Sequence, residues 1–376
     1  MIRRSLTTAG AVVPIALLGL TACSSGGSST DGGENAGGFD ASTATSAEDF
    51  GGFDALVEAA QAEGELNVIA LPENWANYGK IIAAFEDEYG ITVNSASPDV
   101  SSAEEIQAAD NLRGQNTAPD VFDLGTAVAL TSLDYFAPYQ VQTWADIPAE
   151  NKEATGLWVN NYTGIMSVGY DSSKFDAPTS LDDLLAAEYK GAVALNGNPT
   201  EAGAAFAGVA MATVQSGGEL DDFQPGINFF AELNTVGNFL TVDPTPATIA
   251  QGETPVVIDW SFNNIGQKAD TPDWANTVLP GTAYVSYYNE AINKDAPHPA
   301  AARLWQEWIF SDTVQNLYLE AGAFPVRLAA MDAAGTVDAA ALKDAGGLPE
   351  NQVTATTSQT EAANTLLAAE WPKVIG

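Results

Sequence analysis

The stretch from residue 282 to 326 constrains the fold most, because it predicts a strand followed by a turn and two helices. β-Branched and aromatic residues are dense in 282–293, which predicts the strand. Pro299 suits the first position of a helix, and apolar residues then recur at helical spacing at Ala302, Trp305, Ile309 and Phe310. Ser311 fits the cap of a second helix. A strand with two helices behind it predicts an α/β fold.

Length and charge narrow the class of protein further. A chain of 376 residues exceeds what one core usually organises, so two lobes are expected. The chain has 13 lysines and arginines against 49 aspartates and glutamates. The first 22 residues hold Arg3 and Arg4 and no acid, so their removal leaves a net charge of 11 minus 49, or −38. Such a charge repels nucleic acid and anionic lipid, so neither is an expected partner, although most of these carboxylates are expected simply to keep the protein soluble.

Residues 1–22 have the pattern of a signal peptide. Arg3 and Arg4 precede an apolar run from about residue 9 to 20, which Pro14 interrupts and which is shorter than the about 20 residues of a membrane span. The ending Leu-Thr-Ala-Cys at 20–23 resembles a bacterial lipobox, which implies cleavage before Cys23 and a lipid on that residue. The protein would then be extracytoplasmic and held at the bacterial cell membrane. Both the Sec and the twin-arginine export routes stay open.

Residues 23–50 are rich in Ser, Gly, Thr, Asn and acids, which predicts a disordered tether after the lipidated cysteine. Cys23 is the only cysteine, so the exported body holds no internal disulfide and no cysteine-based metal cluster.

Three further segments carry a family resemblance. They read PDVFDLG at 119–125, WVNNYTGIMSVGY at 158–170 and INKDAPHPAAARLWQEWIFSDTVQNLYLEAGAFPV at 292–326. Their order and spacing resemble the extracellular solute-binding proteins of ABC transporters, which have the type 2 periplasmic-binding-protein fold. The branch of ferric-iron, polyamine, phosphonate and sugar-phosphate binders is the most similar. The resemblance covers about residue 65 to 327.

The resemblance implies an α/β fold of two lobes with a ligand cleft between them. Lobe 1 would comprise 51–163 and 289–327, and lobe 2 would comprise 164–288 and 328–376. Crossing strands near 162–170 and 284–292 would join them. A small-molecule solute would bridge the cleft, favour the closed state, and pass to the ABC permease subunits. We expect a monomer without a cofactor.

Residues at the carboxyl ends of the first and third predicted strands are candidates for the cleft, because open α/β sheets bind ligands there. They are Glu73, Asn74, Trp75, Asp123 and Thr126. Trp75 is equally compatible with packing on the helix that follows it.

The predicted strand that ends at Asp259 and Trp260 offers a different kind of site. A carboxylate beside an indole suits a cationic ligand through charge pairing and cation–π attraction, and Asn263 adds a hydrogen-bonding group. The plainer alternative makes Asp259 a turn residue and Trp260 a packing residue.

The segment 196–203 opens a helix and contains two further candidates, Asn198 and Thr200. A helix start can bind phosphate. Here, however, Glu201 is expected in the first turn, where it would cap the helix and repel an anion, so a well-capped helix is the favoured interpretation.

Tyr287 and Tyr288 are adjacent, as are the iron-binding tyrosines of ferric-binding relatives. Neighbours in a strand point to opposite faces, so we expect one of the two to face the cleft and the other to be packed. Tyr287 is the candidate site residue, although the choice between the two stays open, and we predict no metal site. The one histidine, His298, lies between two prolines and is expected in a turn.

The acidic and aromatic candidates favour a small organic cation such as a polyamine. Anionic ligands are usually bound by arginine side chains, and arginine is nearly absent from this chain outside Arg113, Arg303 and Arg327. A phosphonate, a sugar phosphate, thiamine and ferric ion stay open as ligands. The rival class is an exported hydrolase with a carboxylate pair. No carboxylate spacing favours it, and no catalytic motif is present in the sequence. We therefore predict a binding protein and not an enzyme.

Overall fold

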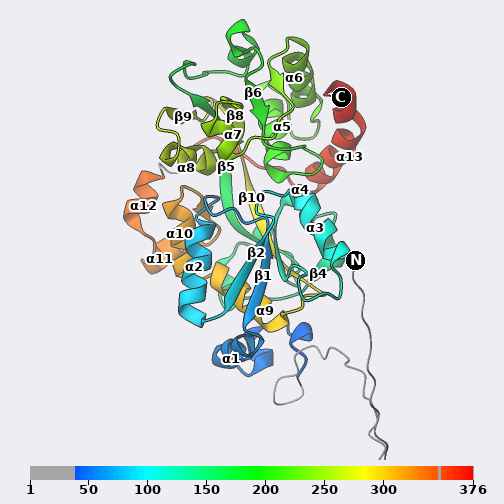
Figure 1. Cartoon of the computed structure of the whole chain (residues 1–376), viewed down its shortest axis with the longest axis vertical. Coiled ribbons are helices and arrows are strands. Elements are labelled where there is room, and N and C mark those ends of the chain that lie inside the picture. Colours follow the sequence, from blue (N-terminus) through cyan, green and yellow to red (C-terminus); the bar gives the residue numbers. More distant parts are fainter. Residues whose placement is uncertain (1–38, 346–348, 376) are drawn as a thin grey trace, which may run out of the picture. The chain divides into compact units, whose positions relative to one another are not determined.

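The computed structural model describes residues 39–345 and 349–375. In this part of the chain, helices and strands form two groups, which we call lobe 1 and lobe 2, and two long strands run through both (Figure 1).

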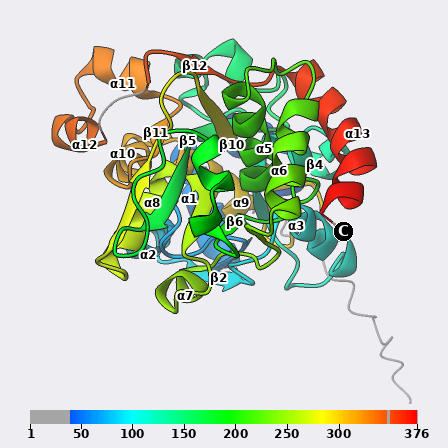
Figure 2. The same ribbon diagram turned by 90° about the horizontal axis from the view of Figure 1, so that it is seen from above.

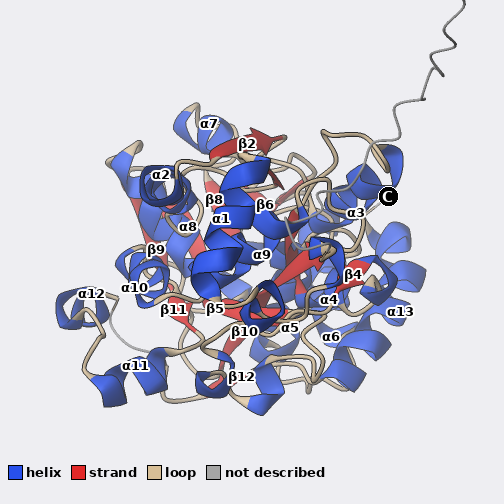
Figure 3. Ribbon diagram, turned by 90° about the horizontal axis from the view of Figure 1, so that it is seen from below, coloured by secondary structure: helices blue, strands red, loops and turns tan. Residues whose placement is uncertain are grey.

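Lobe 1 is built on the first third of the chain and on two later helices. Strands β1 and β2 pair in parallel, as expected for a strand, helix, strand unit. The elements of lobe 1 are α1 (Phe53–Glu63), β1 (Glu65–Ile69), α2 (Tyr78–Tyr89), β2 (Thr92–Ala96), α3 (Ser102–Asn111), β3 (Val121–Gly125), α4 (Thr126–Ala129), β4 (Phe136–Ala137), α9 (Pro299–Ile309), α10 (Asp312–Glu320) and β11 (Phe324–Pro325). Helices α1 and α9 pack together (Figure 3).

Lobe 2 has a parallel core of three short strands, in which β8 pairs with β6 and β6 with β7. Its elements are β6 (Val193–Leu195), α5 (Gly203–Gln215), α6 (Gln224–Thr235), β7 (Phe239–Leu240), α7 (Pro246–Ala250), β8 (Val256–Trp260), α8 (Ser261–Gly266) and β9 (Trp274–Thr277). Helix α5 is rich in alanine and glycine and is buried along nearly its whole length, because small side chains let it pack closely on both α6 and the strands.

Strands β5 (Val159–Asp171) and β10 (Ala283–Asn293) connect the lobes, which confirms the two predicted crossing strands. They pair with each other in antiparallel fashion. One half of β10 also pairs with β3 of lobe 1, and the far half of β5 pairs with β8 and β9 of lobe 2. The two lobes are therefore joined through these two strands.

The helices after β10 follow the pattern of their sequence. Pro299 opens α9, and Trp305 lies in the core, edge-on to Phe85 at 5.2 Å between ring centroids. Ser311 caps α10 by accepting a hydrogen bond from the Val314 N–H at 3.3 Å. Both predicted helices are confirmed.

The C-terminal segment runs along both lobes. Its elements are α11 (Leu328–Ala334), α12 (Ala339–Asp344), β12 (Gln352–Val353) and α13 (Thr357–Val374). Helix α12 contacts α10 of lobe 1, strand β12 pairs with β10, and α13 lies beside α6 of lobe 2 (Figure 2). Trp371 docks against Phe230, with ring centroids 5.3 Å apart. The prediction placed 328–376 wholly with lobe 2, whereas α12 packs on lobe 1.

Residues 40–50 are folded, so the prediction of a disordered tether up to residue 50 is wrong for this part. They form two short 3-10 helices, Ala41–Thr43 and Ala47–Phe50. The Arg303 guanidinium donates hydrogen bonds to the carbonyls of Ser42 and Ala44, and small side chains of the segment itself, such as Ala41, are buried. This contact cannot be predicted from the polar composition of the segment, because its partner, Arg303, is distant in the sequence. The predicted signal peptide 1–22 and Cys23 lie outside the described residues.

Candidate functional site

A cavity of about 650 Å³ lies between the lobes. Lobe 1 contributes the loops that follow β1 and β2, the start of α3 and Asp123 of β3, and lobe 2 contributes Asp259 of β8 and the segments that follow β6, β7 and β8. These are mostly carboxyl ends of strands, where ligands of open α/β sheets bind. We call this cavity the cleft.

The cleft is acidic. Its lining includes Asp99, Glu104, Glu105, Asp123, Glu201, Asp243 and Asp259. Among the described residues that line it, none is lysine, arginine or histidine. The walls therefore attract cations and repel anions, apart from any backbone amides that point inward.

Asp259 lies at the end of β8, on the lobe 2 wall, with 6% of its surface exposed. Its carboxylate accepts hydrogen bonds from the Trp260 N–H at 2.7 Å and from Asn263 Nδ2 at 3.0 Å. Burial raises its pKa to about 6, although these donors lower it in part. Asp259 is thus fixed in position by neutral groups, and in the part of the chain that the structure describes its charge has no cationic partner.

Asp123 occupies the matching position at the end of β3 in lobe 1 and is 5% exposed. It accepts hydrogen bonds from Asn161 Nδ2 at 3.0 Å and from the Tyr162 hydroxyl at 2.9 Å. Burial raises its pKa to about 6 as well. Each lobe therefore presents one positioned carboxyl group to the cleft.

Trp75 and Tyr288 form an aromatic wall beside Asp123. Trp75 Nε1 donates to the Tyr162 hydroxyl at 2.7 Å, which fixes the indole. The Trp75 and Tyr288 rings meet edge to face with centroids 5.4 Å apart. Aromatic faces next to carboxylates suit an ammonium group, because both attract positive charge.

The two walls touch at two points, so the lobes are closed on each other. The Ala103 N–H in α3 donates to the Glu201 carbonyl in lobe 2 at 3.1 Å. Gly125 and Gly203 also meet, since a Cβ atom on Gly125 would lie 2.5 Å from the Gly203 Cα. Only glycine permits this approach of the two backbones.

Several of the residues predicted from the sequence come together in the cleft. Its lining includes Asn74, Trp75, Asp123, Asn198, Asp259 and Asn263. They come from the loop after β1, from β3, from the loop after β6, and from the end of β8 with the start of α8. Their position at or near strand ends had selected most of them.

The lining does not include Glu73, Thr126, Thr200, Trp260 or Tyr287. Glu73 and Thr200 are exposed to solvent, and the Thr200 hydroxyl bonds to Asn198 Oδ1 at 2.9 Å. Trp260 is buried, and its Nε1 donates to the Tyr288 hydroxyl at 3.2 Å, so it packs behind the wall. The plainer alternative for Trp260 therefore describes its position.

Tyr288, and not Tyr287, lines the cleft. Tyr287 faces a second cavity of about 560 Å³ together with Thr126. We predicted that the two tyrosines point to opposite faces of the strand. Which face is turned to the cleft depends on how β10 pairs in the sheet, and its pairing with β5 shifts register between Tyr287 and Asn289.

The start of α5 also differs from its prediction. Glu201 precedes the helix, which begins at Gly203, and no side chain among the residues that the structure describes caps its first amides. Gly203 and Ala204 line the cleft. The expectation that Glu201 caps this helix was wrong.

Sequence reasoning missed Glu105 and Asp243 in the lining, and it did not decide between Tyr287 and Tyr288. Glu105 carried a usable signal, since it falls three residues after Ser102 and four before Ala109 on the buried stripe of α3. A glutamate on a buried stripe is unusual and often functional.

His298 lies away from the cleft lining. Its Nδ1 is 2.9 Å from Asp120 Oδ2, and its backbone N–H donates to Asp120 Oδ1 at 2.7 Å. In 39–345 and 349–375, no cluster of three or more histidine, cysteine or acidic side chains could hold a metal ion. In the same ranges no helix is both long and apolar enough to cross a membrane.

A model of the family described as bacterial extracellular solute-binding protein matches residues 119–346. The chain belongs to this family. The solute-binding protein is therefore the substrate-binding component of an ABC transporter, acts outside the cytoplasm, and delivers a small solute to permease subunits. The family and the structural neighbours are transport-associated binding proteins rather than enzymes.

Solved structures of two-lobe binding proteins resemble the fold. The periplasmic binding protein P5PA has a TM-score of 0.65 at 18% identity, covering 83% of this chain and 100% of that one. AfuA from Actinobacillus pleuropneumoniae, with fructose-6-phosphate bound, has a TM-score of 0.63 at 16% identity, covering 83% and 99%. A putative spermidine/putrescine ABC transporter protein from Listeria monocytogenes has a TM-score of 0.59 at 12% identity, covering 82% and 99%. Among curated proteins, none matches this chain.

Proposed function

We propose that this solute-binding protein captures a small organic cation, with polyamines as the favoured class. The observation that supports this most strongly is the lining of the cleft, which has carboxylates on both walls and, among its described residues, no basic side chain. A polycation would neutralise several of these charges at once.

The geometry supports a specific arrangement of the ligand. One ammonium group would bind Asp259 on lobe 2, and another would bind Asp123 on lobe 1 beside Trp75 and Tyr288. Because these groups belong to different lobes, a ligand that contacts both stabilises the closed state more than the open one. Without the ligand, the acidic walls repel each other on closure.

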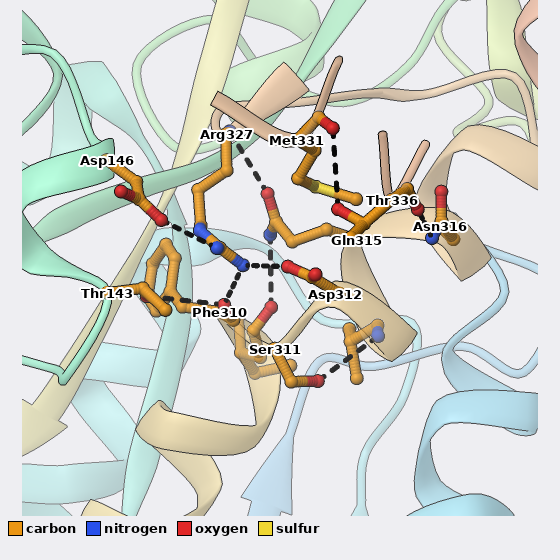
Figure 4. A network of polar contacts seen from close by, with 12 residues as sticks. Thr143, Asp146, Phe310, Ser311, Asp312, Gln315, Asn316, Arg327, Met331 and Thr336 are labelled. Carbon is orange, nitrogen blue, oxygen red and sulfur yellow. Dashed lines mark hydrogen bonds and ion pairs between the residues drawn. The ribbon is translucent and has the colours of Figure 1, made fainter. Parts of the chain in front are cut away.

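The arginines are used elsewhere, which supports the same ligand class. Arg327 pairs with Asp146 and Asp312 in lobe 1 (Figure 4). Arg303 binds backbone carbonyls, and Arg113 forms exposed ion pairs with Asp110 and Asp295. An anionic ligand would find none of them in the cleft.

A thermal-shift and calorimetry screen tests the proposal. Spermidine and putrescine would be compared with fructose 6-phosphate, a phosphonate, thiamine and ferric citrate. A ligand at a hundredfold excess over its Kd should add about 2.7 kcal/mol to the free energy of unfolding. Stabilisation by the amines alone supports the proposal, and stabilisation by phosphorylated compounds alone contradicts it.

One observation favours a second candidate, a ligand that carries an anionic group. The first turn of α5 is uncapped and Gly203 and Ala204 line the cleft, so their amides could bind phosphate or carboxylate. Under this alternative, Asp259→Asn should leave binding unchanged or strengthen it, whereas a cation should bind much more weakly.

We also propose that the protein is a monomer held at the bacterial cell membrane by lipid on Cys23, a residue outside the described part of the chain. The support is the lipobox-like ending at 20–23. Metabolic labelling with a fatty acid should mark the wild type and leave Cys23→Ser unlabelled, and labelling of that variant would contradict the proposal.

A further inference from the structure

Three carboxyl groups are buried together beneath the lobe 1 wall of the cleft. They belong to Glu105 in α3, Asp123 in β3 and Glu290 in β10, and their exposed fractions are 1%, 5% and 1%. Asn161 Nδ2 bridges Asp123 at 3.0 Å and Glu290 at 3.3 Å. The Asp123 N–H donates to Glu105 Oε2 at 3.2 Å. We call these three residues the acid cluster.

The donors around the acid cluster are neutral. Trp305 Nε1 donates to Glu290 at 2.9 Å, and the Tyr162 hydroxyl donates to Asp123. The titratable groups that face it are tyrosines from four elements, namely Tyr78 of α2, Tyr162 of β5, Tyr288 of β10 and Tyr318 of α10. None of the ion pairs found in 39–345 and 349–375 includes a member of the cluster.

Three buried carboxyls without a cation do not all ionise. Each buried charge costs several kcal/mol, and like charges add to that cost. Burial, followed by the charge of Asp123, raises the pKa of Glu105 and of Glu290 well above the usual range. The empty cluster therefore retains at least one proton near neutral pH.

Glu105 and Asp123 line the cleft, whereas Glu290 lies behind them. A positive charge that enters the cleft at this wall thus meets a carboxyl group able to give up its proton. Glu104, the neighbour of Glu105, differs from it because it is exposed and its carboxylate caps α3 at Ser101.

We infer that Glu105 is a further cation-recognition residue and that an ammonium ligand, on binding at Asp123 and Glu105, displaces a proton from the acid cluster to solvent. This inference rests on the proposed function. One carboxylic O–H bond breaks and its proton passes to the buffer, while the ligand nitrogen keeps its own protons. One cation enters as one proton leaves, so the charge of the buried wall does not change. A neutral ligand gains nothing from this exchange.

Calorimetry with spermidine tests the inference. Titration at pH 7.5 in two buffers of different ionisation enthalpy gives the number of protons released. Asp259 and Asp123, with pKa values of about 6, are mostly ionised there, so the release reports chiefly on Glu105 and Glu290. We expect release of about one proton, and the affinity should rise about tenfold per pH unit.

Glu105→Gln should abolish most of the release and flatten the pH dependence, while its amide oxygen still accepts from the Asp123 N–H. Glu290→Gln provides a second variant if the first fails to fold, because its amide oxygen still accepts from Trp305. With one acid fewer, the remaining carboxyl groups of the cluster should already be ionised before spermidine binds, so that binding releases less than one proton. Glu104→Gln is the matched control, which should bind spermidine a few fold more weakly and release the same number of protons.

The outcomes separate the two proposals. Spermidine binding without proton release, or equal release by wild type and Glu105→Gln, would overturn the inference and leave the proposed function standing. An absence of binding by any amine would overturn both. Loss of release in Glu105→Gln alone, with release intact in Glu104→Gln, would support the inference.

Discussion

Charged side chains are buried both around Arg327 and in the cleft, but only around Arg327 are they paired with groups of opposite charge. The Arg327 side chain is 7% exposed and donates to Asp312 at 2.8 Å, to Asp146 at 2.7 Å and to the Phe310 carbonyl at 2.6 Å (Figure 4). In the cleft, Asp123 and Asp259 are buried to a similar extent, and the donors that they receive from residues 39–345 and 349–375 are all neutral.

This difference shows which charges serve the fold and which are available to a ligand. A buried guanidinium that is paired with carboxylates holds its elements together, here the start of α10 and the segment around Asp146. A positioned carboxylate without a cation lowers stability and gains most when a cation arrives. The predictions below test this contrast, beginning with the largest effect.

Removal of Arg327 should be the most damaging change. Arg327→Leu removes the donor to Asp312 and Asp146 and one of the donors to the Phe310 carbonyl, which keeps the Thr143 hydroxyl, and we expect a loss of about 3 kcal/mol in the free energy of unfolding. Urea denaturation measures it. Arg113→Leu is the control, because its ion pairs are exposed and should contribute about 0–1 kcal/mol. Equal losses in the two variants would contradict the contrast.

The stability of the empty protein should depend on pH through the cleft acids. Burial raises the pKa of Asp259 from 3.8 to about 6, so the folded state holds this proton more tightly than the unfolded chain. Below about pH 4 Asp259 is protonated in both the folded and the unfolded state and costs no stability. As pH rises from about 4 to 6, its ionisation lowers the free energy of unfolding by at most about 3 kcal/mol.

Asp259→Asn should remove this pH dependence. The difference in unfolding free energy between the variant and the wild type, measured from pH 4 to 8 without ligand, should shift in favour of the variant as pH rises. A difference that is constant across this range would show that Asp259 is not desolvated as the structure indicates.

The same substitution should act in the opposite direction on binding. Asp259→Asn keeps a group that accepts from the Trp260 N–H but removes the charge, so we expect polyamine affinity to fall about 10- to 100-fold, as for a charge-assisted hydrogen bond of about 1.5–3 kcal/mol. Calorimetry at pH 7.5 measures the change. Intact affinity would rule out Asp259 as a cation-binding residue.

Two substitutions outside the cleft should have the smallest effects. Glu73 is exposed and Tyr287 faces the second cavity, so Glu73→Gln and Tyr287→Phe should each change the binding free energy by less than about 0.5 kcal/mol. A clear loss of affinity in either variant would mean that the ligand extends beyond the cleft described by the structure.

Much of the fold could be predicted from sequence because its signals are local. The apolar run before Asp259, the proline that opens α9 and the cap at Ser311 each act within a few residues of their own position. The strand-end rule selected Asp123, the carboxylate beside an indole selected Asp259, and the structure places both in the cleft lining.

The errors have one physical cause, which is that the deciding partner is distant in the sequence. Residues 40–50 looked disordered, but Arg303 anchors them. Glu201 looked like a helix cap, but its carbonyl instead meets Ala103 of the other lobe.

The sequence by itself determined the family, the two crossing strands and the acidic character of the chain, because periodicity, turn residues and composition are properties of short segments. Only the tertiary structure decided which tyrosine reaches the cleft and that Glu105, Asp123 and Glu290 are buried together. The pairing of β10 with β3 and β5 sets these positions, and a strand's register and the burial of a carboxyl group depend on neighbours that the local sequence does not contain.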